Sequence, residues 1–162
     1  MSNTHQEPPV CYILVGPPGV GKTTFVQKHL ENVEVLSTDN ILLAIAKEEG
    51  ITYNEAFEKH FGKAQAQFDA KMTDCIVNKK SFVVDRTNLT VKTRRRTLSR
   101  LSNDYTSTAF VFSVPPVDEL VERITKRAEE NTQFVPRFVI EDMLKKYEAP
   151  TSLEGFGMII HV

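Results

Sequence analysis

The sequence lacks the features that mark a secreted, membrane-spanning or strongly basic protein. Its only two cysteines, Cys11 and Cys75, are too few for a disulfide scaffold, and their apolar neighbours predict buried free thiols in a reducing compartment. No apolar run approaches the ~20 residues that a membrane-spanning helix needs. The net charge of −1 does not indicate a globally basic nucleic-acid-binding protein, although it leaves room for a local basic patch.

The first nine residues, MSNTHQEPP, have neither a basic segment nor an apolar core, so they predict no secretory signal. We expect residues 1–9 to form a short flexible leader and residues 10–162 to form one domain. Hydrophobic residues make up 41% of the chain and charged residues 25%, which is typical of a globular domain with its own core. These features together predict a cytoplasmic protein.

Short apolar segments alternate with helical patterns along the chain. This alternation predicts an α/β fold with a central, mostly parallel sheet of about five strands and helices on both faces. The predicted strands cover residues 11–15, 33–36, 81–85, 108–114 and 157–162. The predicted helices cover about 23–29, 40–47, 91–101, 117–129 and 136–147, with one further, long helix after residue 52.

The long helix is predicted from its N-terminal signal and its apolar period. Thr52 and Glu55 form a capping-box pattern, in which each side chain satisfies a free backbone donor of the first turn. Apolar residues then recur at steps of three and four, so we expect them to share one buried face. These residues are Phe57, Phe61, Ala64, Phe68, Met72 and Ile76.

The strongest motif is Gly16-Pro17-Pro18-Gly19-Val20-Gly21-Lys22-Thr23, which matches G-x-x-x-x-G-K-[ST] between a predicted strand and a predicted helix. The glycines let backbone N–H groups wrap a phosphate, and the helix N-terminus adds partial positive charge. We expect Lys22 to contact the β- and γ-phosphates and Thr23 to bind Mg²⁺. Residues 16–24, which include Thr24, are therefore predicted to bind Mg²⁺-ATP.

Two acids follow predicted strands, whose carboxyl ends meet at one edge of a parallel sheet. Asp39 follows the second strand. It could take a proton from an attacking hydroxyl, bind Mg²⁺ through water, or only cap the next helix. Asp85 follows the third strand and could support the metal, contact the substrate, or serve only as a turn residue.

Two arginines, Arg123 and Arg127, stand four residues apart and therefore share one face of a predicted helix. Two guanidinium groups on one face can bracket a polyphosphate. Residues 129–133 are predicted to be flexible before Pro136. The pattern predicts a helical lid that closes over the nucleotide and excludes water, the alternative being a solvated charged helix.

A basic cluster follows the Asp85 loop and would spread over much of the circumference of its helix. Some members are expected to face a nucleic-acid backbone and the others to be solvated. The low net charge favours contact with a chain end or a single base over a long electrostatic track. The cluster consists of Lys92, Arg94, Arg95, Arg96 and Arg100.

From Cys11 to about Phe156 the chain resembles the kinase domain of the polynucleotide 5′-hydroxyl kinases, including phage members, within the P-loop kinases. The resemblance rests on five motifs in order: GPPGVGKTT, STDN, VVDRTNL followed by RRR, FSVPP, and ERITKR followed by VPRFVIEDMLKKY. It implies an ATP-dependent kinase with Mg²⁺ that phosphorylates a hydroxyl of nucleic acid, most simply a 5′-hydroxyl end. For a phage-encoded member it implies the host cytoplasm.

The resemblance also assigns roles to residues of this chain. It implies that Asp39 is the general base, that Lys22 and Arg127 act on the transferring phosphoryl group, and that Arg123 is a second lid arginine. It implies that Asp85 positions the acceptor. The further candidate acceptor-binding residues are Arg86, Asn88, Arg94 and Arg95.

Two departures leave the acceptor open. The phage enzymes carry an arginine three residues after the catalytic acid to hold the acceptor's phosphate, where this chain has Leu42. No phosphatase domain is attached, so a bifunctional end-healing enzyme is not expected. The alternatives are a kinase for a hydroxymethylated DNA base, a kinase for a small-molecule alcohol and, from another class, a nucleotide-dependent switch ATPase.

Overall fold

The structure is a computed structural model that describes residues 6–162. Of the predicted leader, residues 1–5 lie outside the described residues, and residues 6–9 have no regular secondary structure. Among residues 6–162, no helix is both long and apolar enough to cross a lipid bilayer. Cys11 and Cys75 are buried free thiols, as predicted.

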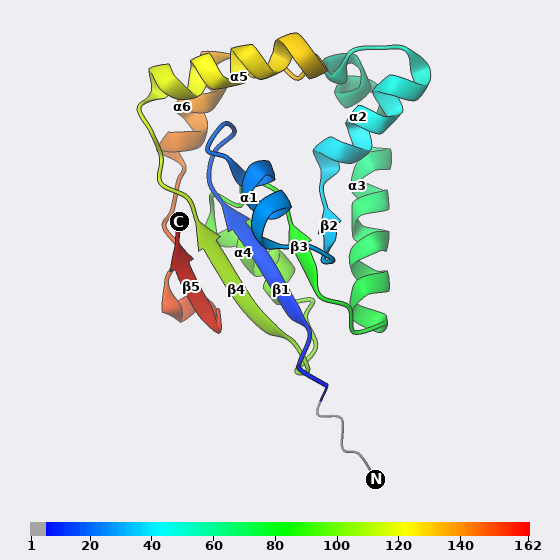
Figure 1. Cartoon of the computed structure of the whole chain (residues 1–162), viewed down its shortest axis with the longest axis vertical. Coiled ribbons are helices and arrows are strands. Elements are labelled where there is room, and N and C mark those ends of the chain that lie inside the picture. The colour runs from blue at the N-terminus through cyan, green and yellow to red at the C-terminus, as the bar shows by residue number, and fades with distance from the viewer. Residues whose placement is uncertain (1–5) are drawn as a thin grey trace.

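A five-stranded, fully parallel sheet forms the centre of the molecule, with the strand order β2-β3-β1-β4-β5. The predicted α/β fold is therefore confirmed. The carboxyl ends of the strands meet at the upper edge of the sheet in Figure 1. The strands are β1 (Val10–Val15), β2 (Glu34–Leu36), β3 (Phe82–Val84), β4 (Thr106–Val111) and β5 (Met158–His161).

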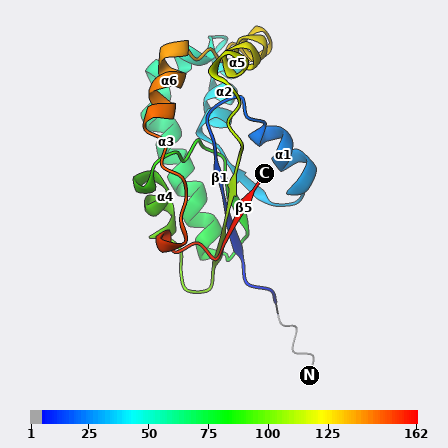
Figure 2. The ribbon, with the colours of Figure 1, turned by 90° about the vertical axis from the view of Figure 1, so that its left-hand side faces the viewer.

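Helices cover both faces of the sheet and its carboxyl edge. Figure 2 shows the sheet edge-on, with α1 on one side and α3 and α4 on the other. In Figure 1, α5 crosses above the carboxyl ends of the strands, next to α6. The helices are α1 (Lys22–His29), α2 (Thr38–Glu49), α3 (Tyr53–Val77), α4 (Val91–Leu98), α5 (Val117–Asn131) and α6 (Arg137–Lys145), and a 3₁₀ turn covers Ser152–Glu154.

The core follows from the alternation of side chains along the strands. Ile13 and Val15 of β1 pack in the cluster that contains residues of α2 and α3, whereas Leu14 packs with Val26 of α1. A third cluster joins α5 and α6 to Val20 of the phosphate-binding motif. The helices above the sheet are thus fixed to that motif by apolar contacts.

Two predicted elements end three residues earlier than expected, because their hydrogen-bond partners end. The strand predicted at 108–114 covers Thr106–Val111, since β1 pairs with it only as far as Val15. The helix predicted at 91–101 ends at Leu98. Its last turn tightens into i→i+3 bonds, such as that from the N–H of Arg100 to the carbonyl of Thr97.

The predicted apolar face of α3 is buried only in part. The capping box of Thr52 and Glu55 is present, and Phe68 and Met72 are buried as expected. Phe57 and Phe61, however, are each 44% exposed, so the prediction that they are buried is wrong. The reason is that α3 begins beyond the carboxyl ends of the strands, where no strand covers its first turns (Figure 1).

Candidate active site

The phosphate-binding motif forms the turn from β1 into α1. Gly19 and Gly21 have φ angles of +86° and +100°, a region that other residues rarely adopt. A Cβ at Gly16 would lie 2.9 Å from the side chain of Val20. The N–H of Gly16 donates to the carbonyl of Thr87 at 3.0 Å, which ties the motif to the loop after β3.

Lys22 is held inside this turn. Its Nζ donates to the carbonyls of Gly16 and Pro17, each at 2.8 Å. Burial lowers the pKa of Lys22 to about 8, while Asp85 and Asp39 favour its charged form. The ammonium group and two carboxylates therefore share one electrostatic environment.

A cavity of about 400 Å³, which we call the phosphate cavity, opens above the turn. Most of the residues that the sequence assigns to phosphates and metal line it: Pro18, Gly19, Gly21, Lys22, Thr23, Thr24, Asp39, Asp85, Arg123 and Arg127. Gly16, Pro17 and Val20 do not line it. Arg123 donates to the carbonyl of Gly19 at 3.0 Å and to Glu119. The α5 arginines therefore reach the phosphate-binding turn.

The residues present fit a nucleoside triphosphate with Mg²⁺. The Nε and Nη2 atoms of Arg127 are buried, and no hydrogen-bond acceptor for them lies within residues 6–162. Buried guanidinium donors of this kind match phosphate oxygens. Thr23 lines the cavity, and its hydroxyl would be available to a Mg²⁺ ion held mainly by phosphate oxygens and water. Within the described residues, no cluster of His, Cys, Asp or Glu side chains forms a separate metal site.

A second cavity of about 500 Å³ adjoins the phosphate cavity beside the end of β4, and we call it the β4 cavity. It shares Gly21, Thr24 and Arg123 with the phosphate cavity, and its apolar walls are Phe25, Phe112, Val114 and Pro115. These walls suit the base of a bound nucleotide. Sequence reasoning did not assign them, because they come from two segments that only the fold brings together.

A third cavity, of about 510 Å³, lies on the opposite side of the phosphate cavity, and we call it the apolar cavity. Phe57 and Phe61 of α3 form one wall. The other wall comes from the connection between α5 and α6 and from α6 itself: Phe134, Val135, Pro136, Val139 and Met143. Phe57 and Phe61, which the sequence predicted to be core residues, therefore line a cavity next to the phosphate cavity.

Asp39 and Asp85 lie where the phosphate cavity and the apolar cavity meet, since both residues line both cavities. Asp39 does not cap α2, because Ser37 is the N-cap and its Oγ accepts from the N–H of Asn40 at 3.2 Å. Its carboxylate is left for another role. Burial raises the pKa of Asp85, whereas the charge of Lys22 opposes this shift.

Tyr53 was not found by sequence reasoning, and it connects Asp39 to the C-terminal end of α5. Its hydroxyl donates to Oδ1 of Asp39 at 2.7 Å, and its N–H donates to Oγ1 of Thr132 at 3.0 Å. Residues 129–133 were predicted to be flexible. In the structure α5 continues to Asn131 and Gln133 is 7% exposed, whereas Glu129, Glu130 and Thr132 are exposed.

The predicted acceptor-binding residues separate into two groups. Arg86 lines both the apolar and the phosphate cavities. The prediction that Asn88 and Arg94 bind the acceptor is wrong, because both side chains are buried and hydrogen-bonded within the protein. The Asn88 amide donates to the Leu14 carbonyl at 2.7 Å, and the fully buried Arg94 pairs with Glu154 at 2.7 Å.

The remaining two positions lie apart from the cavities. Arg95 is exposed on α4 and lines none of the cavities. Burial acts to raise the pKa of Glu154, but its hydrogen bonds with Arg94 and Thr151 lower it, and the charge of Arg95 adds a smaller lowering effect. Leu42 is fully buried in the main core. A side chain at position 42 therefore cannot reach a bound acceptor without leaving the core.

The parallel sheet, the phosphate-binding turn and the helices above it define a P-loop nucleotide-binding fold. Residues 12–150 match a family model described as an AAA domain, and the chain belongs to this family.

Relatives of this chain include kinases. An L-seryl-tRNA(Sec) kinase from Methanococcus maripaludis is 26% identical over 141 residues, covering 85% of this chain and 52% of that protein. The chain thus spans about half the length of this curated relative.

Solved structures show the same fold. A protein from Chloroflexus aurantiacus that was assigned as a kinase superposes with a TM-score of 0.71 and 20% identity, covering 97% of this chain and 86% of that one. A chain of the Pnkp1/Rnl/Hen1 RNA repair complex gives 0.67 and 25%, covering 89% of this chain and 45% of that one.

Proposed function

We propose that this protein is an ATP-dependent kinase that transfers the γ-phosphate to a hydroxyl group of a nucleic acid, most simply a 5′-hydroxyl end. One observation carries the proposal: Asp39 and Asp85 line both the phosphate cavity and the apolar cavity, so they lie where the two cavities meet. The chemistry of a switch ATPase, which is hydrolysis, does not require a second cavity at the phosphates. A phosphotransferase needs one for its acceptor.

The proposed roles follow from this arrangement. The acceptor's hydroxyl oxygen attacks the γ-phosphorus, and Asp39 accepts the proton as the new O–P bond forms and the bond to the β-phosphate oxygen breaks. Lys22 and Arg127 stabilise the charge on the transferring group. Thr23 would hold Mg²⁺ together with the phosphates, and the ion would supply further charge neutralisation.

The walls of the apolar cavity favour a nucleobase over a small polyol. Phe57, Phe61 and Phe134 line the apolar cavity and are 44%, 44% and 48% exposed, so their aromatic rings are accessible to a ligand in it. Base–aromatic stacking contributes about 1–3 kcal/mol per base. A small polyol would leave these aromatic faces unmatched. The similarity to an RNA repair protein and to a tRNA kinase supports the same class of acceptor.

The test is transfer of labelled γ-phosphate to a panel of acceptors. The panel contains 5′-hydroxyl DNA, 5′-hydroxyl RNA, blocked-end DNA with hydroxymethylated bases, free nucleosides and small polyols. We expect the 5′-hydroxyl ends to be the best acceptors. Preference for the blocked-end DNA would move the assignment to a base kinase, and preference for polyols would contradict a nucleic-acid acceptor altogether.

A further inference from the structure

A narrow groove runs between α3 and α4 and opens into the apolar cavity. Its interior measures about 110 Å³, and we call it the α3–α4 groove. The groove shares Gln65, Arg86 and Thr87 with the apolar cavity, so the two form one continuous surface. A ligand in the apolar cavity therefore has a path along α3 and α4.

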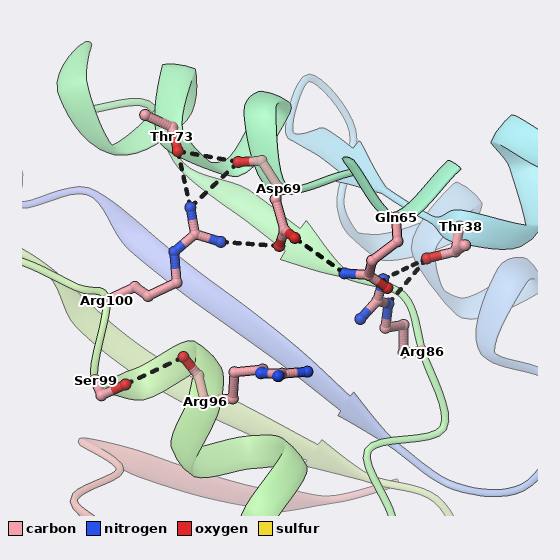
Figure 3. A network of polar contacts seen from close by, with 8 residues as sticks. All are labelled: Thr38, Gln65, Asp69, Thr73, Arg86, Arg96, Ser99 and Arg100. Atoms are coloured by element: carbon pink, nitrogen blue, oxygen red, sulfur yellow. Dashed lines mark hydrogen bonds and ion pairs between the residues drawn. The ribbon is translucent and has the colours of Figure 1, made fainter. Parts of the chain in front are cut away.

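Figure 3 shows three arginines along this groove, and they differ in what compensates their charge. Arg100 is paired with Asp69 at 3.2 Å and also donates to Thr73, so its charge is balanced. Arg86 is held by neutral groups: it donates to the Thr38 hydroxyl at 3.0 Å and to the Gln65 amide oxygen at 2.7 Å.

Arg86 is further fixed because its guanidinium lies 3.7 Å from the centre of the Phe68 ring. Arg96 is exposed on α4, and no carboxylate within residues 6–162 pairs with it. A chain with a net charge of −1 therefore keeps two guanidinium groups in one groove with no acidic partner of their own.

Arg86 is influenced by charged groups both at the site of phosphoryl transfer and in the α3–α4 groove. Burial lowers the pKa of Arg86, Asp69 and Asp39 oppose this shift, and the positive charge of Arg96 adds to it. Arg86 therefore lies within electrostatic reach of Asp39 on one side and of Arg96 on the other. An anion between the two guanidiniums would relieve their mutual repulsion, and the planar guanidinium suits phosphate oxygens.

We propose that the α3–α4 groove binds the backbone of the acceptor strand, with Arg86 and Arg96 holding the phosphate that follows the nucleoside being phosphorylated. This proposal rests on the proposed function and extends it from a nucleoside to a strand. The apolar cavity would hold the base, and the groove would hold the first phosphodiester.

The test compares a 5′-hydroxyl trinucleotide with the matching nucleoside, in the wild-type protein and in Arg96→Gln. We expect the variant to raise the KM and the anisotropy Kd of the trinucleotide about tenfold, the equivalent of about 1.4 kcal/mol. The nucleoside KM should stay within twofold. The slope of log Kd against log salt should fall by about 0.7, the value for one phosphate contact on a single strand.

Two further arms sharpen the result. A trinucleotide whose first linkage is a neutral methylphosphonate should bind the wild type at least tenfold more weakly, and the same change should cost less in Arg96→Gln, because one of the two guanidinium contacts is already lost there. Lys71→Gln removes one exposed charge of α3 outside the described cavities and should change neither acceptor. Arg95→Gln distinguishes this proposal from the sequence-based prediction that Arg95 binds the acceptor.

The proposal is overturned if Arg96→Gln and Lys71→Gln behave alike, if the nucleoside is weakened as much as the trinucleotide, or if Arg95→Gln and not Arg96→Gln weakens the strand. Wild-type protein that transfers phosphate to neither acceptor would contradict the proposed function instead. In that case the anisotropy Kd of the trinucleotide still tests whether the α3–α4 groove binds a strand. An unchanged Kd in Arg96→Gln overturns the proposal for the groove, and a tenfold loss of affinity supports it.

Discussion

The phosphate cavity and the apolar cavity are built from different kinds of structure. The phosphate cavity is centred on one continuous segment, β1, the turn and α1, with buried charged groups and fixed backbone donors. The apolar cavity is assembled from the start of α3 and the α5–α6 region, which are far apart in the chain: Tyr53 and Thr132, which are hydrogen-bonded to each other, are separated by 79 residues. Phosphates can be recognised by a local motif, whereas an acceptor's shape requires tertiary structure.

The difference separates the expected effects of substitution. Changes in the phosphate cavity should alter nucleotide binding and transfer for every acceptor. Substitutions in the apolar cavity should alter the binding of the acceptor and leave the binding of the nucleotide unchanged. Asp39 stands at the junction, so its substitution should lower the rate of transfer without altering the binding of either substrate.

The largest effect is expected for Asp39→Asn. The amide keeps the shape of the side chain and loses its basicity, so the single-turnover transfer rate should fall by ~10²–10⁴-fold. The ATP Kd, measured by calorimetry, should stay within twofold. Collapse of ATP binding would show that Asp39 is mainly a metal site, and an unchanged rate would remove it from the chemistry.

Lys22→Ala should lower transfer by ~10²–10³-fold, the usual loss when one electrostatic donor is removed from a transition state. The fold should persist because glycine geometry, not the lysine, shapes the turn. The melting temperature should therefore match that of Lys71→Ala, a control on exposed α3. Wild-type transfer rates in Lys22→Ala would contradict the assignment of the phosphate cavity.

The same lysine gives the phosphate cavity a pH dependence. Because its pKa is lowered to about 8, Lys22 is charged at pH 7 and loses its proton as the pH rises to 9. Phosphates bind the charged form, so the ATP Kd should rise up to about tenfold over this range. Lys22→Ala should show a flat profile, and an equal rise in that variant would assign the effect to another group.

The sequence predicted the phosphate cavity better than the apolar cavity for a physical reason. The phosphate-binding turn is encoded by residues adjacent in the chain, and Lys22, Thr23 and Arg127 all line the expected cavity. The apolar period of α3 could not reveal that its first turns project beyond the sheet, so Phe57 was assigned to the core. Arg94 was likewise assigned to the acceptor, because its partner Glu154 lies 60 residues away.

Phe57→Ala should raise the KM of a nucleoside acceptor about tenfold, the equivalent of about 1.4 kcal/mol and within the range for losing one stacked base. The ATP Kd should not change, since Phe57 lines only the apolar cavity among the cavities described. Phe138→Ala is the matched control, because Phe138 is 70% exposed and lines none of them. Equal effects of the two substitutions would argue against stacking in the apolar cavity.

Tyr53→Phe should have the smallest effect, a fall in kcat of about fivefold, because it removes the 2.7 Å hydrogen bond that orients Asp39. The ATP Kd and the acceptor KM should stay within twofold, a split that a loss of structure alone would not give. Tyr105→Phe loses two hydrogen bonds far from the site and should lower stability but not kcat. A fall in kcat for both variants would indicate a general loss of structure.

The central claim is that the nucleotide and the acceptor occupy two cavities that meet at Asp39. Its most direct test is the Kd of a bridging compound, in which adenosine is joined through a polyphosphate to the 5′-oxygen of a second nucleoside. The wild-type protein should bind this compound at least tenfold more tightly than ATP, and Phe57→Ala should abolish that gain while leaving the ATP Kd unchanged. Equal affinities for the bridging compound and ATP in both proteins would contradict the account.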